Sequence, residues 1–171
     1  MDGTFAVLTL ALGLWDMAAN YCPNDGCLAD YNGQSRYSIS AGNVMFQDDT
    51  ISNEVYIRKD TGRFKGPFEL VYGLSTTTEG STWAGIGAAW TKENWSRTAY
   101  VQLHVMPGIY LHGDGADLGG PIEFRSGIEA GLQARSGARF GISYDHRSNA
   151  DIYGYNPGME TIQLRVSIPT N

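Results

Sequence analysis

Three segments near the carboxyl end of the chain alternate strictly between apolar and polar residues. In residues 121–134 one face carries Ile122, Phe124, Ser126 and Ile128, while the residues between them include charged side chains. Residues 138–148 and 159–169 repeat this pattern. A period of two residues is typical of a β-strand whose two faces meet different surroundings. The chain should therefore be built from such strands.

Turn signals recur at short intervals from Tyr37 onward, which is typical of consecutive antiparallel hairpins. We expect eight strands, at 36–46, 51–60, 67–77, 81–91, 97–111, 121–134, 138–148 and 159–169. Each has about the 9–11 residues that a tilted membrane strand needs, or somewhat more. The predicted fold is all-β: an eight-stranded antiparallel transmembrane β-barrel of the outer-membrane type, spanning residues 36–169.

The polar face of these strands carries charges of both signs, which can pair inside a narrow lumen while the apolar face meets lipid. The charged residues are Glu69, Glu123, Glu129, Arg58, Arg125, Arg139 and Arg165. His104 lies on the same face and should hydrogen-bond within the lumen. A soluble sandwich or a soluble lipid-binding barrel remains an alternative, with the apolar stripe turned inward.

Composition supports an all-β chain and excludes one class of partner. The sequence has 22 glycines, 12% aromatic residues and 18% charged residues. The net charge of −6 would repel nucleic-acid phosphates, so we expect no nucleic-acid binding. Four aromatic residues near strand ends are expected in interfacial girdles: Trp83, Trp90, Trp95 and Tyr110.

Residues 1–35 form an extension before the predicted barrel. Phe5 to Trp15 is an apolar run of the length of a signal-peptide core, although an extra strand or an interior helix would also fit. Cys22 and Cys27 flank a turn-rich stretch and could close a small disulfide loop, or they are two unrelated thiols. The region has no histidine that would suggest a metal site.

The longest predicted connections, at 112–120 and 149–158, should lie at the same end of the barrel. In outer-membrane barrels the long loops are extracellular, so both should face outward. Asp114 and Asp117 within the first loop could suggest calcium, but the bidentate glutamate of a calcium loop is missing. A flexible surface loop is the better interpretation.

A histidine, a serine and a glutamate flank the second loop. Their spacing can place all three side chains on one face of the hairpin, as a hydrolytic triad requires. His146 and Ser148 are two residues apart on one strand face, and Glu160 can lie opposite His146 across the hairpin. A serine hydroxyl becomes a nucleophile when a histidine takes its proton and a carboxylate orients that histidine. The same face carries apolar residues, which suits a lipid substrate.

Four further residues are candidates for contacts with the substrate. Asn149 and Asn156 could donate hydrogen bonds to an oxyanion. Gly158, expected opposite Ser148, would leave room for the substrate. Arg147 points away from the apolar stripe but lies at the membrane edge, where it could reach a lipid phosphate.

The stretches His146-Arg-Ser-Asn149 and Asn156-Pro-Gly-Met-Glu160 resemble the PagL-type lipid A 3-O-deacylases, and the segment from His112 to Gly127 is similar to acyloxyacyl hydrolase-type members. The resemblance covers residues 110–169 most specifically. It implies an outer-membrane barrel of a Gram-negative bacterium, with lipopolysaccharide as substrate, a 3-hydroxy fatty acid as product, and no metal or cofactor. Ser148 would be the nucleophile, His146 the base and Glu160 the orienting acid.

Two features depart from the family pattern. The chain ends Ile168-Pro-Thr-Asn171, without the terminal aromatic residue that outer-membrane barrels commonly carry, and no Lys or Arg precedes the apolar run at Phe5 to Trp15 as it would in a signal peptide. The alternative function is a non-enzymatic structural or accessory barrel subunit of a membrane assembly. A homodimer is also compatible with the sequence.

Overall fold

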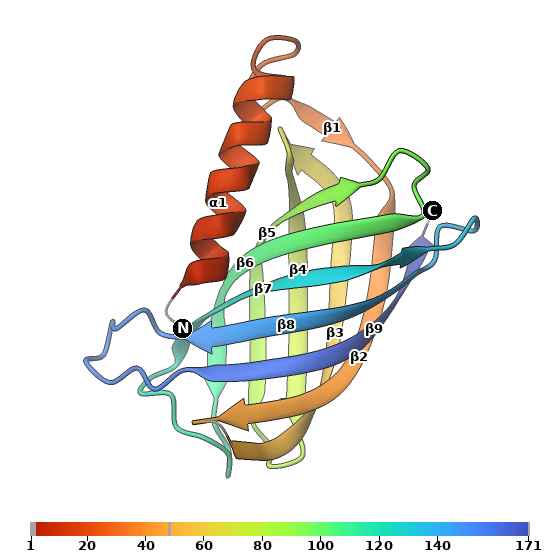
Figure 1. Ribbon diagram of the computed structural model, residues 1–171. Helices are drawn as coiled ribbons and strands as arrows, with labels where there is room; N and C mark the ends of the chain where they lie inside the picture. Colours follow the sequence, from red (N-terminus) through yellow and green to blue (C-terminus); the bar gives the residue numbers. More distant parts are fainter. Residues whose placement is uncertain (1–2, 48, 171) are drawn as a thin grey trace.

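Eight antiparallel strands close into a barrel in the computed structural model, which describes residues 3–47 and 49–170 (Figure 1). The barrel strands are β2 (Ser35–Phe46), β3 (Asp49–Lys65), β4 (Phe68–Thr77), β5 (Thr82–Glu93), β6 (Ala99–Leu111), β7 (Ile122–Gln133), β8 (Arg139–Ser148) and β9 (Met159–Thr170). Each strand pairs with its neighbour in sequence, and β2 pairs with β9 to close the ring. The predicted eight-stranded barrel is confirmed.

The strand boundaries agree with the sequence-based prediction to within two residues, except at the end of β3. That strand continues to Lys65, and its last residues pair both with β4 and with a short strand before the barrel, β1 (Asp30–Asn32). β1 was not expected from the sequence. It extends the sheet at the end of the barrel where the connections are short.

The lumen is filled by charged side chains that pair within strands, between neighbouring strands and across the barrel. Arg125 lies 2.8 Å from Glu54 and 2.5 Å from Asp145, and Arg58 lies 2.7 Å from Asp60. Further pairs join Arg165 to Glu129, Arg147 to Glu54 and Arg139 to Glu93. Burying unpaired charges is costly, so mutual pairing is what allows this interior to be polar.

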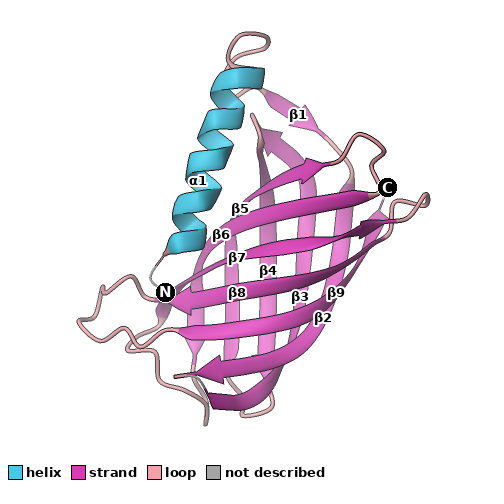
Figure 2. Cartoon of the chain, in the orientation of Figure 1, coloured by secondary structure: helices cyan, strands magenta, loops and turns pink. Residues whose placement is uncertain are grey.

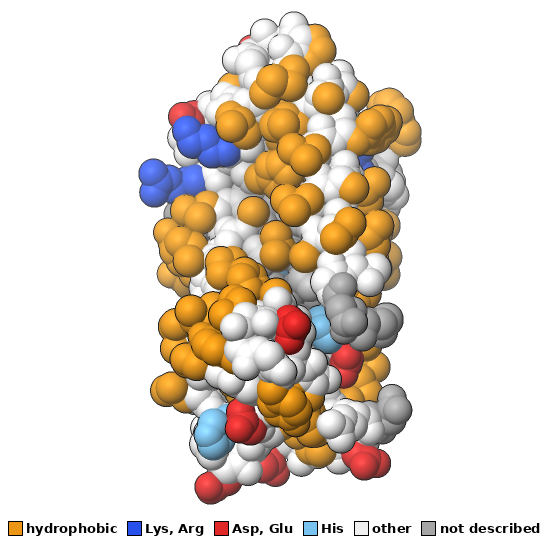
Figure 3. Space-filling view, turned by 90° about the vertical axis from the view of Figure 1, so that its left-hand side faces the viewer, with side chains coloured by type: hydrophobic (Ala, Val, Ile, Leu, Met, Phe, Trp, Pro, Cys, Tyr) orange, Lys and Arg blue, Asp and Glu red, His pale blue; other side chains and the backbone are white. Residues whose placement is uncertain are grey.

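The outer surface of the barrel is apolar over most of its height. Leu132, Phe140, Ile142 and Leu164 are each more than half exposed and point away from the lumen. Figure 3 shows apolar side chains over much of one such face, with acidic side chains gathered toward the end that carries the long loops. A polar interior with an apolar exterior suits lipid, so the soluble alternatives are wrong.

The expectation of aromatic girdles is only partly correct. Trp83 and Tyr110 are buried and point into the lumen, where Trp83 packs against Tyr56. Trp90 points outward but is covered, and its Nε1 donates to Asp16 at 2.9 Å. Trp95 is fully exposed in the turn between β5 and β6. Position near a strand end did not reveal which face each ring occupies.

The apolar run near the amino end forms helix α1 (Thr4–Asp16), which lies along the outer wall of the barrel (Figure 2). It contacts β5, β6 and β7, so neither the extra strand nor the interior helix is correct. Thr9, Gly13 and Asp16 form its buried face, and its leucines point outward. Small residues at the interface let a helix approach closely, and here Gly13 lies directly over the Phe68 ring.

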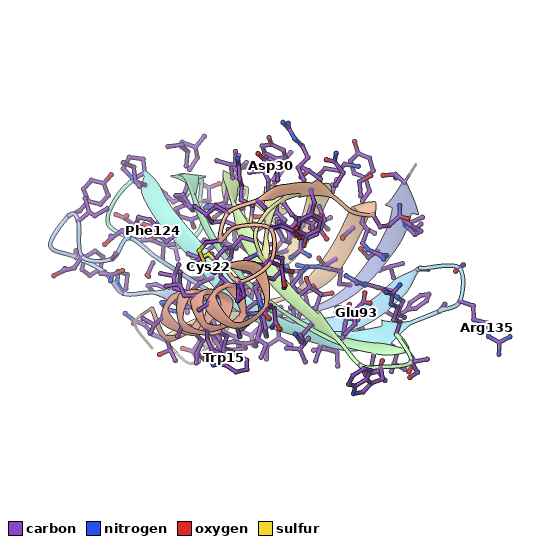
Figure 4. All side chains as sticks on the ribbon, turned by 90° about the horizontal axis from the view of Figure 1, so that it is seen from above. Trp15, Cys22, Asp30, Glu93, Phe124 and Arg135 are labelled. Atoms are coloured by element: carbon purple, nitrogen blue, oxygen red, sulfur yellow. A yellow bond between two sulfur atoms is a disulfide. The ribbon has the colours of Figure 1, made fainter. Side chains whose placement is uncertain are left out.

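A π-helical turn, η1 (Met17–Tyr21), continues α1 and leads into the cysteine loop. Cys22 and Cys27 are joined in a disulfide, visible near the end of the helix in Figure 4. Trp15, two-thirds exposed, points away from the barrel in the same view. In the described part of the chain, no helix is both long enough and apolar enough to cross a membrane.

Candidate active site

The hairpin of β8 and β9 places a histidine and a glutamate side by side on the outer face of the barrel. His146 is paired directly with Glu160 in the strand register. The Nδ1 atom of His146 lies 3.0 Å from Oε1 of Glu160. A carboxylate at this position fixes which imidazole nitrogen carries the proton and stabilises the charged ring. The other nitrogen, Nε2, is then left to act as a base.

The serine of the predicted triad lies on the same face, two residues further along β8. The intervening Arg147 and the preceding Asp145 both point into the lumen, so His146 and Ser148 point outward. Both outward residues are nearly buried, at 3% and 7% exposure. Among the described residues Nε2 of His146 has no hydrogen-bond partner. Nε2 is therefore the imidazole nitrogen that remains able to accept a proton.

Gly158 was expected to pair with Ser148 and to leave room for the substrate. In the structure it is not part of the strand ladder, and the space it leaves is occupied by the His146 ring. Its backbone has a φ of +73°, in the left-handed region that favours glycine. A Cβ atom at this position would lie 2.9 Å from Cε1 of His146, which is too close. The glycine thus fixes both the turn into β9 and the place of the imidazole.

The two asparagines have different roles in the structure. The amide of Asn149 is buried and donates to the carbonyls of Leu118 and Tyr155, which joins the two long loops. Its backbone N–H donates to Oδ1 of Asn156. Asn149 is therefore committed to the loops, whereas Asn156 lines the cavity next to Ser148.

Arg147 points away from the apolar stripe, as the sequence suggested, but it does not reach the membrane edge. Its guanidinium is 2% exposed and pairs with Glu54 inside the lumen. The expectation that it reaches a lipid phosphate is wrong, because Glu54 on the distant strand β3 holds it on the opposite side of the barrel wall. His104 is in the lumen as expected, with Nε2 3.5 Å from Asp145.

A cavity of about 590 Å³ opens beside Ser148 on the outer face. It is lined by the strand residues Val105, Phe124, Ser126 and Ser148, the loop residues Ala150, Asp151 and Asn156, and Gly3 and Ala6 at the start of α1. The apolar strand residues suit a hydrocarbon chain, and the loop residues suit a polar group. The cavity thus joins an apolar wall to the serine.

Several of these residues were not singled out from the sequence. Ala150 and Asp151 both have positive φ, which turns the chain sharply after β8 and brings their backbone to the cavity. Their residue types give no signal of this. Ser126 did carry a signal, because it is a polar residue within the apolar stripe of β7.

A family profile described as lipid A 3-O-deacylase (PagL) matches residues 30–169, which includes all eight barrel strands. The chain belongs to the PagL family of lipid A 3-O-deacylases. No curated protein matches it.

Two solved structures share the fold of this PagL-family chain. The crystal structure of the outer membrane enzyme PagL superimposes with a TM-score of 0.67 at 18% sequence identity, covering 79% of this chain and 99% of that one. A de novo designed transmembrane β-barrel gives a TM-score of 0.60 at 8% identity, covering 82% and 98% respectively. At these identities the likeness concerns the fold, and the family match supplies the activity.

Family membership and fold together define the protein's class. It is an ester hydrolase of the lipid A 3-O-deacylase family, in the form of an eight-stranded barrel of the Gram-negative outer membrane. Lipid A is the substrate that the family implies. Since the cavity beside Ser148 opens on the lipid-facing surface, the fold and this substrate class agree.

Proposed function

We propose that Ser148, His146 and Glu160 hydrolyse the 3-O-acyl ester of lipid A in the outer leaflet. The observation that carries this proposal is the 3.0 Å contact between His146 Nδ1 and Glu160 on the lipid-facing surface, which leaves Nε2 of the histidine without a hydrogen-bond partner among the described residues. A hydrogen-bonded histidine and glutamate are costly to place against lipid without a purpose.

The reaction proceeds in two steps. His146 Nε2 takes the proton of Ser148 as the hydroxyl oxygen attacks the ester carbonyl carbon. The same proton passes to the departing sugar oxygen, which leaves an acyl-enzyme. Water then attacks the carbonyl carbon of this acyl-enzyme while His146 Nε2 takes its proton. The bond between that carbon and the Ser148 oxygen breaks, the proton passes from His146 to the Ser148 oxygen, and a 3-hydroxy fatty acid is released. Glu160 stabilises the imidazolium in both steps through its contact with Nδ1.

The negative charge that develops on the carbonyl oxygen needs hydrogen-bond donors. Asn156 lines the cavity, and its side-chain amide is the candidate donor. The backbone N–H of Asp151 is the second candidate, because the left-handed turn at Ala150 and Asp151 brings this segment to the cavity wall. These two groups replace Asn149, whose donors are already used between the loops.

The proposal is tested by Ser148→Ala. This variant should fold into a heat-modifiable barrel and lose at least about 10³-fold in activity, because the nucleophile is absent. Mass spectrometry of lipid A should show loss of one acyl chain with the native protein only. Ser143→Ala, a lumen serine on the same strand, is the matched control. Full activity of Ser148→Ala would instead favour the non-enzymatic barrel or a different nucleophile.

We also infer that the protein can form a homodimer in the membrane, an expectation based on sequence alone. Sedimentation of the detergent-solubilised barrel would test it, and a single monomeric species across protein concentrations would reject it.

A further inference from the structure

Ser126 is a polar side chain on an otherwise apolar stripe. The other outward-facing residues of β7 are Ile122, Phe124, Ile128, Ala130 and Leu132. Ser126 is only 3% exposed, and it lines the cavity beside Ser148. A hydroxyl on an apolar surface gains free energy when a polar partner hydrogen-bonds it. A polar group that enters this cavity would be such a partner.

The strand register places Ser126 next to the catalytic pair. Ser126 lies opposite His146, while Ser148 lies opposite Phe124. Ser126 is therefore the diagonal neighbour of Ser148, and such neighbours are about 7–8 Å apart between Cα atoms. Both serines line the cavity of about 590 Å³. Since Glu160 already occupies Nδ1 of His146, Ser126 is not needed to orient the imidazole.

The cavity suggests how an acyl chain would lie. With its carbonyl carbon at Ser148 and its tail along the apolar wall of Val105 and Phe124, the chain passes Ser126 within its first few carbons. The 3-hydroxyl of a 3-hydroxyacyl chain is two carbons from the carbonyl. The diagonal spacing of the serines matches that separation when one hydroxyl attacks the carbonyl and the other hydrogen-bonds the 3-hydroxyl.

We propose that the Ser126 hydroxyl hydrogen-bonds the 3-hydroxyl of the acyl chain being removed, and so makes the enzyme selective for 3-hydroxyacyl esters. This inference rests on the proposed function, because it requires Ser148 to attack that ester. Ser126 is a specificity-determining residue here. It supplies no proton and forms no bond in the reaction.

The test uses two lipid A analogues that differ only in the 3-hydroxyl of the 3-O-linked acyl chain. The kcat/KM ratio of hydroxylated to unhydroxylated substrate is measured for the full-length protein, Ser126→Ala, Ser126→Thr and the control Ser143→Ala. We expect the native protein to prefer the hydroxylated ester by about 3- to 10-fold, which is the worth of one hydrogen bond. Ser126→Ala should lose this preference, and Ser126→Thr should keep most of it because its hydroxyl remains.

Three results would overturn the inference. An unchanged ratio in Ser126→Ala would show that the hydroxyl does not contact the 3-hydroxyl. An equal loss on both substrates would assign Ser126 to the triad instead of to selectivity. A native protein with equal rates on both esters would show that there is no preference to explain. Hydrolysis of neither ester by the native protein would instead mean that the proposed function itself has failed, and this inference with it.

Discussion

Strand β8 carries buried polar residues on both of its faces, but the two faces differ in how these residues are held. Toward the lumen, Asp145 pairs with Arg125 and Arg147 pairs with Glu54, within a network that joins charges from several strands. Toward the lipid, His146 has one charged partner, Glu160, and an unpaired nitrogen beside the cavity. Charge pairing inside the barrel stabilises the structure, whereas an unpaired imidazole nitrogen next to a cavity is available for chemistry.

The largest effect is expected from Glu160→Gln, which breaks the outer pair only. Activity should fall by about 10³- to 10⁴-fold, because an amide can neither fix the required tautomer nor stabilise the imidazolium. Stability should change by no more than about 0.5 kcal/mol, as for most partly exposed positions. Initial rates and urea unfolding measure the two quantities. Glu79→Gln, in an outer loop, is the control, and a variant that keeps half of its activity would contradict the assigned role.

Glu54→Gln should give the opposite pattern, because it breaks the lumen network. Glu54 pairs with both Arg125 and Arg147, so its loss leaves buried positive charge uncompensated. We expect a loss of about 3–5 kcal/mol in the free energy of unfolding. The fraction that folds should keep its specific activity. If the folded fraction were inactive, the two faces of β8 would not be independent.

Gly158→Ala tests whether the close approach of the turn before β9 to the His146 ring matters for activity. The added methyl group would meet Cε1 of His146 at 2.9 Å and would displace the imidazole, so activity should fall by about 10- to 100-fold. Gly154→Ala is a matched control: it has the same φ of +73°, but nothing lies within 4 Å of its Cβ position. Both variants should lose about 1 kcal/mol of stability through backbone strain. Equal activities in the two variants would show that the contact with His146 is unimportant.

The smallest effect concerns α1, which covers part of the same outer wall. Gly13→Leu would drive a side chain into the Phe68 ring and should release the helix from the barrel. We expect faster proteolysis between η1 and β1, with barrel stability changed by about 1 kcal/mol or less. Activity should change only a few-fold, since Gly3 and Ala6 form one wall of the cavity. Leu10→Ala, on the outward face, is the control, and an unchanged cleavage rate in Gly13→Leu would indicate that α1 stays in place.

The features that follow from local alternation were predictable from the sequence. The alternation of side chains along β8 and β9 was enough to predict that His146 lies opposite Glu160 and that both point outward, because the side-chain period of a strand is two residues. Strand boundaries followed from turn residues. By contrast, the apolar run of α1 has no clear period, and its length alone could not distinguish a strand from a helix.

Features that depend on distant strands were not predictable in this way. Parity correctly turned Arg147 away from the lipid, but its partner Glu54 comes from β3, 93 residues earlier. The role of Asn149 likewise depends on Leu118 in another loop. Such contacts are set by closure of the ring, which no local pattern encodes. The contact between His146 and Glu160 was predictable because the two residues are neighbours across a single hairpin.

The filled lumen also determines which route ions, substrate and products can take past this protein. A barrel whose interior is occupied by interlocked guanidinium and carboxylate groups offers no aqueous conduit, so reconstitution into a planar bilayer should produce an electrically silent insertion. Substrate and products must then reach and leave the cavity beside Ser148 by lateral diffusion within one leaflet. The enzyme can therefore remove acyl chains from lipids of the membrane that contains it without making that membrane permeable.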